Sequence, residues 1–335
     1  MRSHRRGTDR PTQKQGPCRS RRDAGREASV PRERHHAPYG KLRHVTRSTA
    51  LFAIASIIWG STWFAIIFQL GTVAPEASVV YRFALAAGLL GAWCFATGRS
   101  LRFSLSQHAW LAAQGTFLFG FNYLGVYLAE QHIASGLVAV LFSLIVFCNL
   151  IGARIVFAAR IGRRTLAAAT LGVAGVVLMF WNAPTAGSAT GPLGIGLALG
   201  ATVLASAGNL IAVRNQRHGL PVLPSVAWGM AYGALAIALV AGAEGVTWSF
   251  DSAPRYLLSL VYLAVFGSII AFGAYLTLLG RIGPARAGYV GVAVPMVALA
   301  VSTAFERYEW TLPALAGAGL CVTGNVLVLL RERSE

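Results

Sequence analysis

Residues 257–280 read LLSLVYLAVFGSIIAFGAYLTLLG, an apolar run without a charged residue. About 20 such residues in a helix cross the hydrocarbon core of a bilayer. Two further apolar runs follow at 285–305 and 312–330. A short basic turn, Arg281-Ile282-Gly283-Pro284-Ala285-Arg286, separates the first two runs. The last quarter of the chain therefore indicates a membrane protein made of closely connected helices.

The overall composition supports the same class of protein. Of 335 residues, 55% are hydrophobic and 12% are charged, and the mean hydropathy is +0.58. A soluble domain carries about 25% charged residues. The four cysteines (Cys18, Cys94, Cys148, Cys321) are scattered without a CxxC motif, so neither a disulfide framework nor a metal site is predicted. No cofactor is expected.

Residues 1–48 differ sharply from the rest of the chain. They hold fourteen Lys and Arg residues against four acidic ones, which accounts for more than half of the net charge of +17. With so few large apolar side chains they cannot form a core, and we predict a disordered basic N-terminal tail. Two explanations of this tail are preferred to a nucleic-acid-binding arm. It is either a cytoplasmic anchor attracted to anionic lipid or the product of a translation start placed too far upstream. No signal-peptide core is present.

The apolar body divides into ten segments of spanning length, and short loops leave no room for a soluble domain. We predict an all-α integral membrane protein with ten transmembrane helices. Their expected positions are 49–69, 77–97, 108–129, 134–157, 165–181, 190–211, 222–243, 257–280, 285–305 and 312–330.

The loop arginines predict the orientation in the membrane. With both termini in the cytoplasm, the cytoplasmic loops hold eleven arginines. The opposite loops hold Arg255 and Arg307 only. This asymmetry follows the positive-inside rule. We therefore expect a multi-pass protein of the cell (inner) membrane with cytoplasmic N- and C-termini.

Two parts of the chain echo each other at an offset of about 150 residues. Glu130–Gly136 precedes the fourth predicted span, and Arg281–Ala287 precedes the ninth. Residues 49–181 and 190–331 would then be two repeats of five helices each. Because five is odd, the second repeat enters the membrane in the opposite sense. Inverted repeats of this kind surround the central site of alternating-access carriers.

The chain resembles the EamA-type drug/metabolite transporters, a superfamily of ten-helix carriers, over residues 49–330. The resemblance lies in the order and spacing of several short motifs. These are Trp59-Gly60-Ser61, Pro75 with Arg82-Phe83, Ile133-Ala134-Ser135-Gly136, Gly172-Val173-Ala174-Gly175-Val176, Gly283-Pro284-Ala285-Arg286-Ala287, Pro295, Glu306-Arg307, and Gly317 with Gly324.

The first repeat departs from the family pattern at two places. It has Ile145 where a proline matching Pro295 is usual, and Phe157-Ala158-Ala159-Arg160 where a pair like Glu306-Arg307 is common. The two repeats are therefore not chemically equivalent.

The resemblance implies a central cavity lined mainly by the first, third, fourth, sixth, eighth and ninth spans. Polar groups and aromatic rings at mid-membrane depth are the candidates for contacting substrate. The alternative for the Asn and Ser residues is structural hydrogen bonding between helices. The predicted substrate-binding residues are Trp59, Asn122, Tyr123, Asn209 and Tyr275.

Arg82 and Pro295 are the candidates for charge recognition and gating. Arg82 lies several positions inside the second span, where it either attracts an anionic substrate or plays a structural part. In the structural reading it snorkels outward or pairs with Glu76 or Glu130. Pro295 breaks the backbone hydrogen bonds of the ninth span. Its free carbonyls either face substrate or let the helix bend, although proline also occurs in membrane helices for packing.

Acidic groups are expected only at the outer ends of the spans, at Glu130 and Glu306. A deep carboxylate relay is therefore not predicted, which leaves an exchanger, a facilitator, or proton coupling through Glu130 at the rim.

These features favour a secondary transporter that exports or takes up a small organic metabolite, amino acid or drug-like solute. The alternative is a membrane-embedded protein without transport activity, either an enzyme or a channel. All seven histidines lie in the tail, in loops or at span ends, so no base for catalysis is expected within the bilayer. The predicted partners are the lipid bilayer and a small-molecule substrate, without nucleic acid, and a homodimer is left open.

Overall fold

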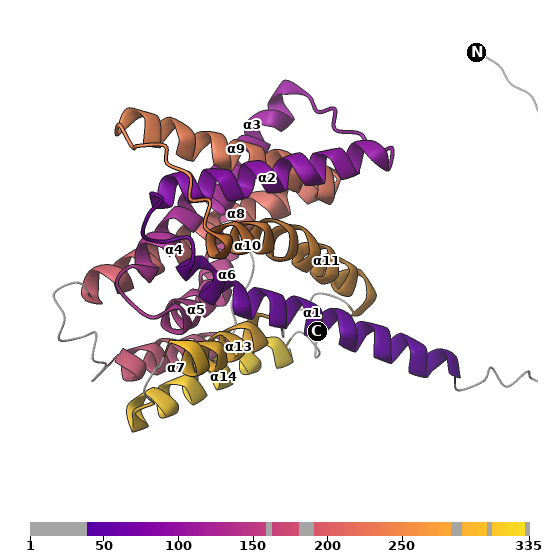
Figure 1. The fold of residues 1–335 in the computed structure, drawn as a ribbon. Helices are drawn as coiled ribbons and strands as arrows, with labels where there is room; N and C mark the ends of the chain where they lie inside the picture. The colour runs from indigo at the N-terminus through magenta and orange to yellow at the C-terminus, as the bar shows by residue number, and fades with distance from the viewer. Residues whose placement is uncertain (1–38, 159–162, 181–190, 283–289, 307–309, 332–335) are drawn as a thin grey trace, which may run out of the picture.

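A computed structural model describes residues 39–158, 163–180, 191–282, 290–306 and 310–331, and these residues are helices joined by turns and short loops (Figure 1). The first half contains α1 (Tyr39–Ile67), α2 (Pro75–Ala96), α3 (Leu105–Gly115), η1 (Thr116–Phe121), α4 (Asn122–Glu130), α5 (Ser135–Ser143), α6 (Ile145–Phe157) and α7 (Arg163–Phe180). The second contains α8 (Gly191–Arg217), α9 (Val222–Ala243), α10 (Pro254–Val261), η3 (Tyr262–Ile270), α11 (Ala271–Ile282), α13 (Val290–Phe305) and α14 (Leu312–Arg331).

Six helices in the described part of the chain are long and apolar enough to cross a membrane. They are Arg47–Ile67, Pro75–Ala96, Ser135–Phe157, Gly191–Arg217, Val222–Ala243 and Pro254–Tyr275. Three shorter apolar helices are Thr170–Met179, Val290–Phe305 and Leu312–Gly324. The remaining predicted span, 108–129, is helical but is interrupted by the π-helical segment η1.

Most of the predicted N-terminal tail, residues 1–38, lies outside the described residues, and its disorder stays a prediction. The described part of the chain begins with α1, whose first turns are Tyr39–Ser48. Helix 39–67 thus begins ten residues before the predicted span. The apolar pattern could not show this, because these turns are polar and lie beyond the apolar run.

Local sequence signals explain where several helices begin and end. Proline occupies the first turn of α2 and of α10, where its missing N–H needs no partner. Ser104 and Gln107 form a capping box at the start of α3. Gly98, which follows α2, adopts a φ of 67°, a left-handed value that glycine tolerates after a helix end.

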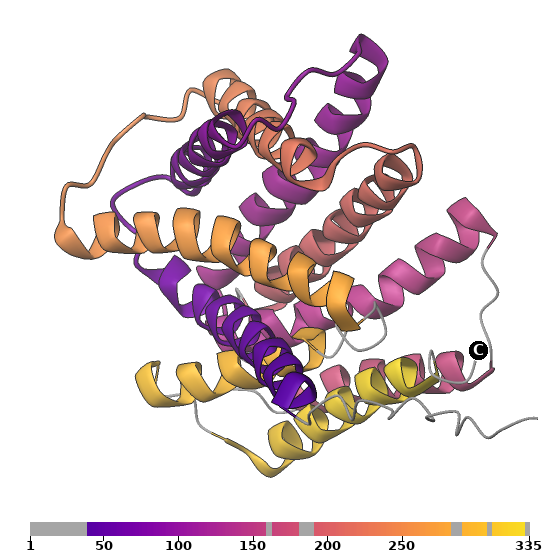
Figure 2. The ribbon, with the colours of Figure 1, turned by 90° about the vertical axis from the view of Figure 1, so that its right-hand side faces the viewer.

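The two halves contact each other in reciprocal pairs. The second helix of each half pairs with the other (α2 with α9), as do the fifth helices (α7 with α14), which lie side by side at one edge in Figures 1 and 2. α1 of the first half packs on α13, and α8, its counterpart, packs on α5 and α6. Likewise α4 packs on α8, and α11 packs on α1.

Glycines allow the closest of these reciprocal crossings. A Cβ added at Gly175 of α7 would lie 2.6 Å from the carbonyl oxygen of Gly317, and one added at Gly317 would lie 2.4 Å from that of Gly175. A Cβ at Gly60 would meet Val297 of α13 at 2.4 Å, and one at Gly152 would meet Leu210 of α8 at 2.3 Å. Small residues let membrane helices approach this closely.

Backbone irregularities occur at matching places in both halves. The third helix of each half contains a π-helical stretch, η1 in the first and η3 in the second. The fourth helix of the first half is interrupted at Leu144, between α5 and α6. Its counterpart α13 carries Pro295 inside the helix. Interruptions of this kind are frequent at functional sites.

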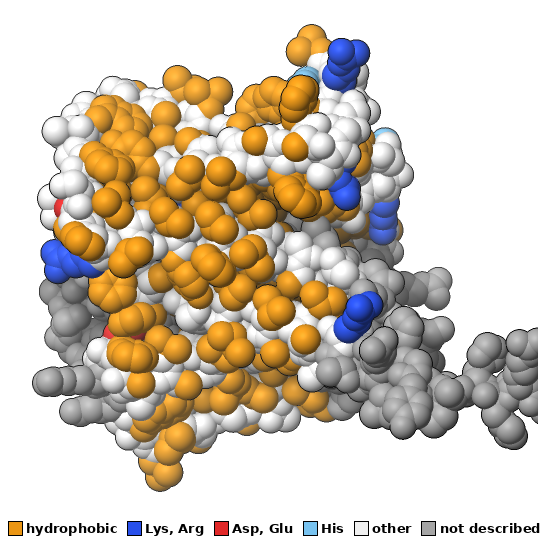
Figure 3. All heavy atoms as spheres, turned by 45° about the vertical axis from the view of Figure 1, so that its right-hand side comes forward, with side chains coloured by type: hydrophobic (Ala, Val, Ile, Leu, Met, Phe, Trp, Pro, Cys, Tyr) orange, Lys and Arg blue, Asp and Glu red, His pale blue; other side chains and the backbone are white. Residues whose placement is uncertain are grey.

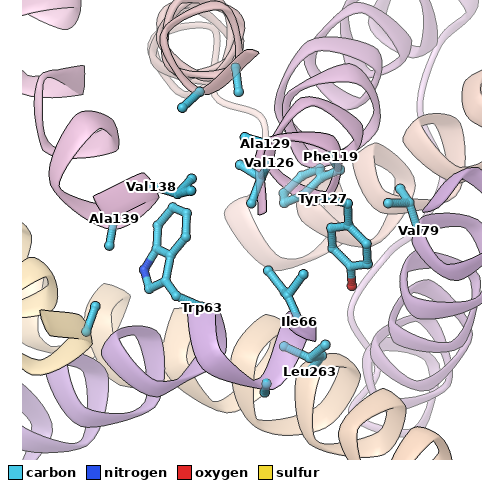
Figure 4. Close-up of a cluster of buried hydrophobic side chains, with 14 of the residues drawn as sticks. Trp63, Ile66, Val79, Phe119, Val126, Tyr127, Ala129, Val138, Ala139 and Leu263 are labelled. Carbon is cyan, nitrogen blue, oxygen red and sulfur yellow. The ribbon is translucent and has the colours of Figure 1, made fainter. Parts of the chain in front are cut away.

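The surface in Figure 3 is a broad apolar band with charged side chains toward its ends. At one end, which we call the arginine end, Arg214 lies over the ring of Trp110 at 3.6 Å and Arg217 over Phe157 at 4.2 Å. The other end, the Glu306 end, carries Glu306 and Ser135. Figure 4 shows the core between them, with Trp63 and Tyr127 among small and branched apolar side chains.

Candidate functional site

A continuous chain of aromatic rings crosses the centre of the bundle. The rings of Tyr275 and Trp59 lie 5.3 Å apart, and Trp59 lies 5.1 Å from Phe272. Phe272 then contacts Phe119 at 6.0 Å. From there Phe119 contacts Phe83 at 5.6 Å, and Phe83 contacts Tyr123 at 4.6 Å. This aromatic chain, formed by Tyr275, Trp59, Phe272, Phe119, Phe83 and Tyr123, joins helices of both halves.

Trp59 is anchored at one end of the aromatic chain by a hydrogen bond. Its indole Nε1 donates to the carbonyl of Gly267 in η3 at 3.0 Å. A π-helical stretch shifts carbonyls out of the regular ladder, which frees them for such contacts. Gly267 is also where Arg82 comes close, because a Cβ added there would lie 3.5 Å from Nη2 of Arg82 and 2.8 Å from Thr62. The π segment thus brings Trp59 and Arg82 to the same glycine.

Arg82 is fully enclosed at the other end of the aromatic chain. Its side chain is 1% exposed, and its guanidinium carbon lies 4.6 Å from the centre of the Tyr123 ring and 5.0 Å from that of Phe83. Its Nε and Nη1 have no hydrogen-bond partner among the described residues. The side chain does not snorkel to the surface. Aromatic faces stabilise a cation, but they leave these hydrogen-bond donors unused.

Glu130 lies near both Arg82 and Glu306 at the Glu306 end. Glu130, the last residue of α4, is 9% exposed and neither of its carboxylate oxygens has a hydrogen-bond partner among the described residues. Arg82 and Glu306 both act electrostatically on its carboxyl group. Tyr127, one turn earlier in α4, is buried beside the same guanidinium. The sequence places Glu130 at the outer end of its span, and it is the last residue of α4, but its side chain is buried there.

Glu306 clamps the start of α5. Its carboxylate accepts a hydrogen bond from the backbone N–H of Ser135 at 3.0 Å and another from the Ser135 hydroxyl. A negative charge at a helix N-terminus is favoured by the free N–H groups and the helix dipole. Beside this clasp, a Cβ at Gly136 would lie 2.8 Å from Cβ of Ser302. We call the Glu306–Ser135 bonds and this glycine contact the α5–α13 seam.

The other predicted residues are less closely connected. Asn122 is buried, and its Nδ2 donates to the Leu118 carbonyl of its own helical segment at 3.0 Å while its Oδ1 has no partner among the described residues. Asn209 is half-buried in α8. Neither asparagine contacts the aromatic chain through an interaction that the structure defines. Trp59 with Tyr275, and Tyr123 with Arg82, are the pairs that the fold brings together.

Pro295 is buried and lines a small pocket with residues of α5 and α14, among them Val140, Ser143 and Cys321. A larger apolar groove of about 490 Å³ lies between α2 and α9. It is lined by Val80, Ala84, Gly88, Trp228, Leu235 and their neighbours, and none of the predicted site residues lines it.

Several central residues were not foreseen. Phe83, Phe119 and Phe272 complete the aromatic chain, but a phenylalanine in an apolar span carries no sequence signal that separates it from ordinary packing. Glu130 was noticed in the sequence, and only its burial was missed. One sequence feature could have indicated this burial. Glu130 lies directly before the Ile133-Ala134-Ser135-Gly136 turn, which packs against α13.

An all-helical bundle with an apolar exterior and a buried polar and aromatic centre shared by both halves defines the class of multi-pass membrane transporters. A sequence model of the EamA-like transporter family matches residues 47–181 and again 192–330. The chain therefore belongs to the EamA-like transporter family, and the resemblance seen in its motifs is confirmed. Its long apolar helices make it a multi-pass membrane protein.

Individual relatives agree with this membership. The "Uncharacterized inner membrane transporter YedA" of Escherichia coli K12 is 29% identical over 295 residues, covering 84% of this chain and 90% of the relative. A "Probable amino-acid metabolite efflux pump" of Salmonella typhimurium is 28% identical over 184 residues, covering 50% of this chain and 58% of the relative. One solved crystal structure shares the fold with a TM-score of 0.60 at 21% identity, covering 87% of this chain and 99% of that one.

Proposed function

We propose that this chain is a secondary transporter that moves a small organic solute across the inner membrane by alternating access. Its ten helices would form two inverted five-helix repeats, residues 49–181 and 190–331. The observation that carries the proposal is the reciprocal helix pairing around the aromatic chain. A two-fold axis between two equivalent halves produces contacts of this kind, and such an axis in the membrane plane is the basis of carriers built from inverted repeats.

The charged side chains support the inverted arrangement. Arg214 and Arg217 mark the arginine end, and Arg99 and Arg102 lie in the loop that leads to α3, whose Trp110 contacts Arg214. With this end in the cytoplasm, both termini lie inside, as the positive-inside rule requires. The Glu306 end then faces the periplasm.

The substrate site would lie along the aromatic chain. Trp59, Tyr123 and Tyr275 supply flat apolar walls, and Asn122 and Asn209 supply hydrogen-bonding groups that can serve either a donor or an acceptor. Arg82 would attract a negatively charged group of the solute, and Pro295 would let α13 bend during the transition. The printed name of the Salmonella relative makes amino acids and related metabolites the first solutes to test, with export as the first direction.

The test is transport by purified protein in lipid vesicles against a panel of radiolabelled amino acids, small metabolites and cationic drugs. We expect saturable flux of at least one solute. Tyr275→Ala and Asn122→Ala should abolish it while the protein still inserts. The matched control is Tyr232→Ala in α9, where the tyrosine contacts His108 at 2.9 Å, outside the aromatic chain.

Two outcomes would count against the proposal. Unchanged flux in Tyr275→Ala and Asn122→Ala would remove these residues from the site. An absence of saturable flux for every solute, with correct insertion, would favour a membrane protein without transport activity.

A further inference from the structure

Three ionisable side chains converge at the Glu306 end from helices of both halves: Arg82 of α2, Glu130 of α4 and Glu306 beyond α13. Nearby polar groups show how this part of the bundle normally satisfies buried atoms. Ser78 donates to the Gln69 carbonyl at 3.2 Å and lies 3.1 Å from the Tyr256 hydroxyl, and the Ser259 hydroxyl donates to the Tyr256 carbonyl at 2.8 Å. Among the buried atoms left without a partner in the described residues, which include the Tyr127 hydroxyl and Oε1 of Gln69, those of Glu130 and Arg82 belong to side chains that can carry opposite charges.

A buried carboxylate without a hydrogen-bond partner is stable only as the neutral acid or beside a cation. The guanidinium of Arg82 cannot lose its proton under ordinary conditions. The two groups therefore have two favourable arrangements. A protonated Glu130 can remain without a partner among the described residues, whereas an ionised Glu130 gains energy by moving toward Nε and Nη1 of Arg82.

The position of Glu130 in the chain connects such a movement to the α5–α13 seam. Only residues 131–134 separate it from Ser135, whose backbone N–H and hydroxyl are held by Glu306 of the other half. Gly136 is packed against Ser302 with no space for a Cβ. A shift of the end of α4 toward Arg82 must therefore be taken up by this short turn and by the seam behind it.

We propose that Glu130 is a proton-binding site whose occupancy controls the α5–α13 seam, closed when the carboxyl is protonated and loosened when it ionises and pairs with Arg82. This inference rests on the proposed function, in which the seam lies on the periplasmic side, and it names the proton as the coupling ion of the carrier. The proton that Glu130 binds comes from water at the Glu306 end and returns there when the seam loosens.

Among the ionisable groups around Glu130, we assign the change of charge to Glu130 itself. Arg82 faces it from α2 and stays charged, and Glu306 faces it from beyond α13 but already accepts two hydrogen bonds from Ser135. Tyr127 of its own helix and Tyr256 of α10 are phenols that keep their protons near neutral pH. From α8, the uncharged Gly194 lies against the Ala129 carbonyl and the Cβ of His132. His132 is a second titratable group in the 131–134 turn, and the Glu130→Gln variant, which leaves it in place, separates its contribution from that of Glu130.

The experiment measures the seam directly and needs no substrate. Spin labels are attached at Gln131→Cys and Phe305→Cys, both exposed positions, after the four native cysteines are replaced by serine or alanine. The distance between the labels is measured in lipid nanodiscs as a function of pH. We expect it to increase by about 2 Å or more as pH rises, on the scale of helix shifts in switching proteins. Infrared difference spectra should show loss of a protonated carboxyl band over the same pH range.

Four variants make the result specific. Glu130→Gln should lock the distance at its short value and remove the infrared band, whereas Glu130→Asp, which still titrates, should keep a pH-dependent shift. Arg82→Gln should keep the infrared band of the protonated carboxyl group but lose the pH-dependent change in the distance between the labels. Glu244→Gln removes an exposed carboxyl at the end of α9 and should behave like the native protein.

The inference is overturned if the native distance is independent of pH, or if Glu130→Gln shifts as the native protein does. Because neither measurement requires transport, vesicle assays without flux would speak against the proposed function alone. A pH-independent seam in a protein that does transport would speak against the proton site alone.

Discussion

The fourth helix of the first half and its counterpart α13 of the second half reach a related shape by different chemistry. α13 carries Pro295 and runs from Val290 to Phe305 as one helix. The first half has Ile145 instead, yet this is the helix that is interrupted, at Leu144. Just before the interruption the Ser143 hydroxyl donates to the Val140 carbonyl at 2.7 Å, a back-bond that tends to bend helices. The lack of a proline therefore does not predict a straight helix.

The far ends of these two helices differ more strongly. α13 ends at the clasp between Glu306 and Ser135, which joins the halves. α6 ends instead at Phe157, whose ring lies under Arg217, and at Ala158, which has a φ of 54°. The backbones of the two halves are thus matched while the chemistry at the two ends is not. The described residues hold a carboxylate link, Glu306 with Ser135, at the Glu306 end and an imidazole link, His108 with Tyr232, toward the arginine end, so the two faces of the protein carry different titratable groups.

The largest effect on the free energy of unfolding is expected from disrupting the contact between Gly175 of α7 and Gly317 of α14, to which both halves contribute equally. Gly175→Ala in α7 and Gly317→Ala in α14 each place a methyl group within 2.6 Å of a backbone oxygen of the other helix. Each should lower the free energy of unfolding by about 1–3 kcal/mol, as overpacking does. The control is Gly319→Ala, with no neighbouring atom within 4 Å. It should gain up to about 1 kcal/mol through higher helix propensity. Thermal unfolding in detergent measures all three.

Equal losses for Gly175→Ala and Gly317→Ala would support the equivalence of the halves. A loss confined to one of them, or a similar loss for Gly319→Ala, would contradict it.

A smaller effect on the free energy of unfolding should come from weakening the clasp between Glu306 and Ser135 at the Glu306 end. Ser135→Ala removes the hydroxyl that donates to Glu306 and keeps the backbone bond. A hydrogen bond to a charged group is worth about 1.5–3 kcal/mol, and part of this should be lost from the free energy of unfolding. Ser252→Ala, at an exposed loop position, should change it by less than about 0.5 kcal/mol. If the two variants unfold alike in a denaturant titration, the hydroxyl bond of Ser135 contributes nothing to stability.

The smallest effect concerns the end of α6. Ala158 adopts a left-handed conformation in which glycine is preferred, so Ala158→Gly should raise the free energy of unfolding by about 0.5–1 kcal/mol. Ala153→Gly, the same change inside α6, should lower it by a similar amount because glycine is a poor helix former. Thermal unfolding of the pair gives the comparison. Changes of the same sign would show that the backbone at Ala158 is not strained.

The elements of the fold were largely predictable because membrane helices are specified by run length and hydropathy. Each predicted span is helical over most of its described residues, and 222–243 has the same bounds as α9. Residues 283–287 of the predicted turn and Arg307 lie outside the described residues, whereas Arg281 and Ile282 are the last residues of α11. The π-helical stretches could not be predicted, because Thr116–Phe121 and Tyr262–Ile270 contain no residue that forces a wider turn.

The candidate site was predictable only in part. The sequence singled out Trp59, Tyr123, Tyr275 and Arg82 by residue type and depth, and the structure places them as two contacting pairs. Whether these residues and both asparagines bind a solute stays a prediction. The connecting phenylalanines and the burial of Glu130 depend on which helices meet. Hydropathy does not contain that information.

The packing of α7 of the first half against α14 of the second half has a consequence for biosynthesis. α7 is complete when scarcely more than half of the chain has left the ribosome, but the glycine face that fits α14 has to wait for the last span. Until then a close-packing surface is open to lipid and to other nascent proteins, the kind of intermediate from which misassembly starts. A protein that lacks only residues 312–331 should therefore be degraded as a whole rather than retained as a stable remnant.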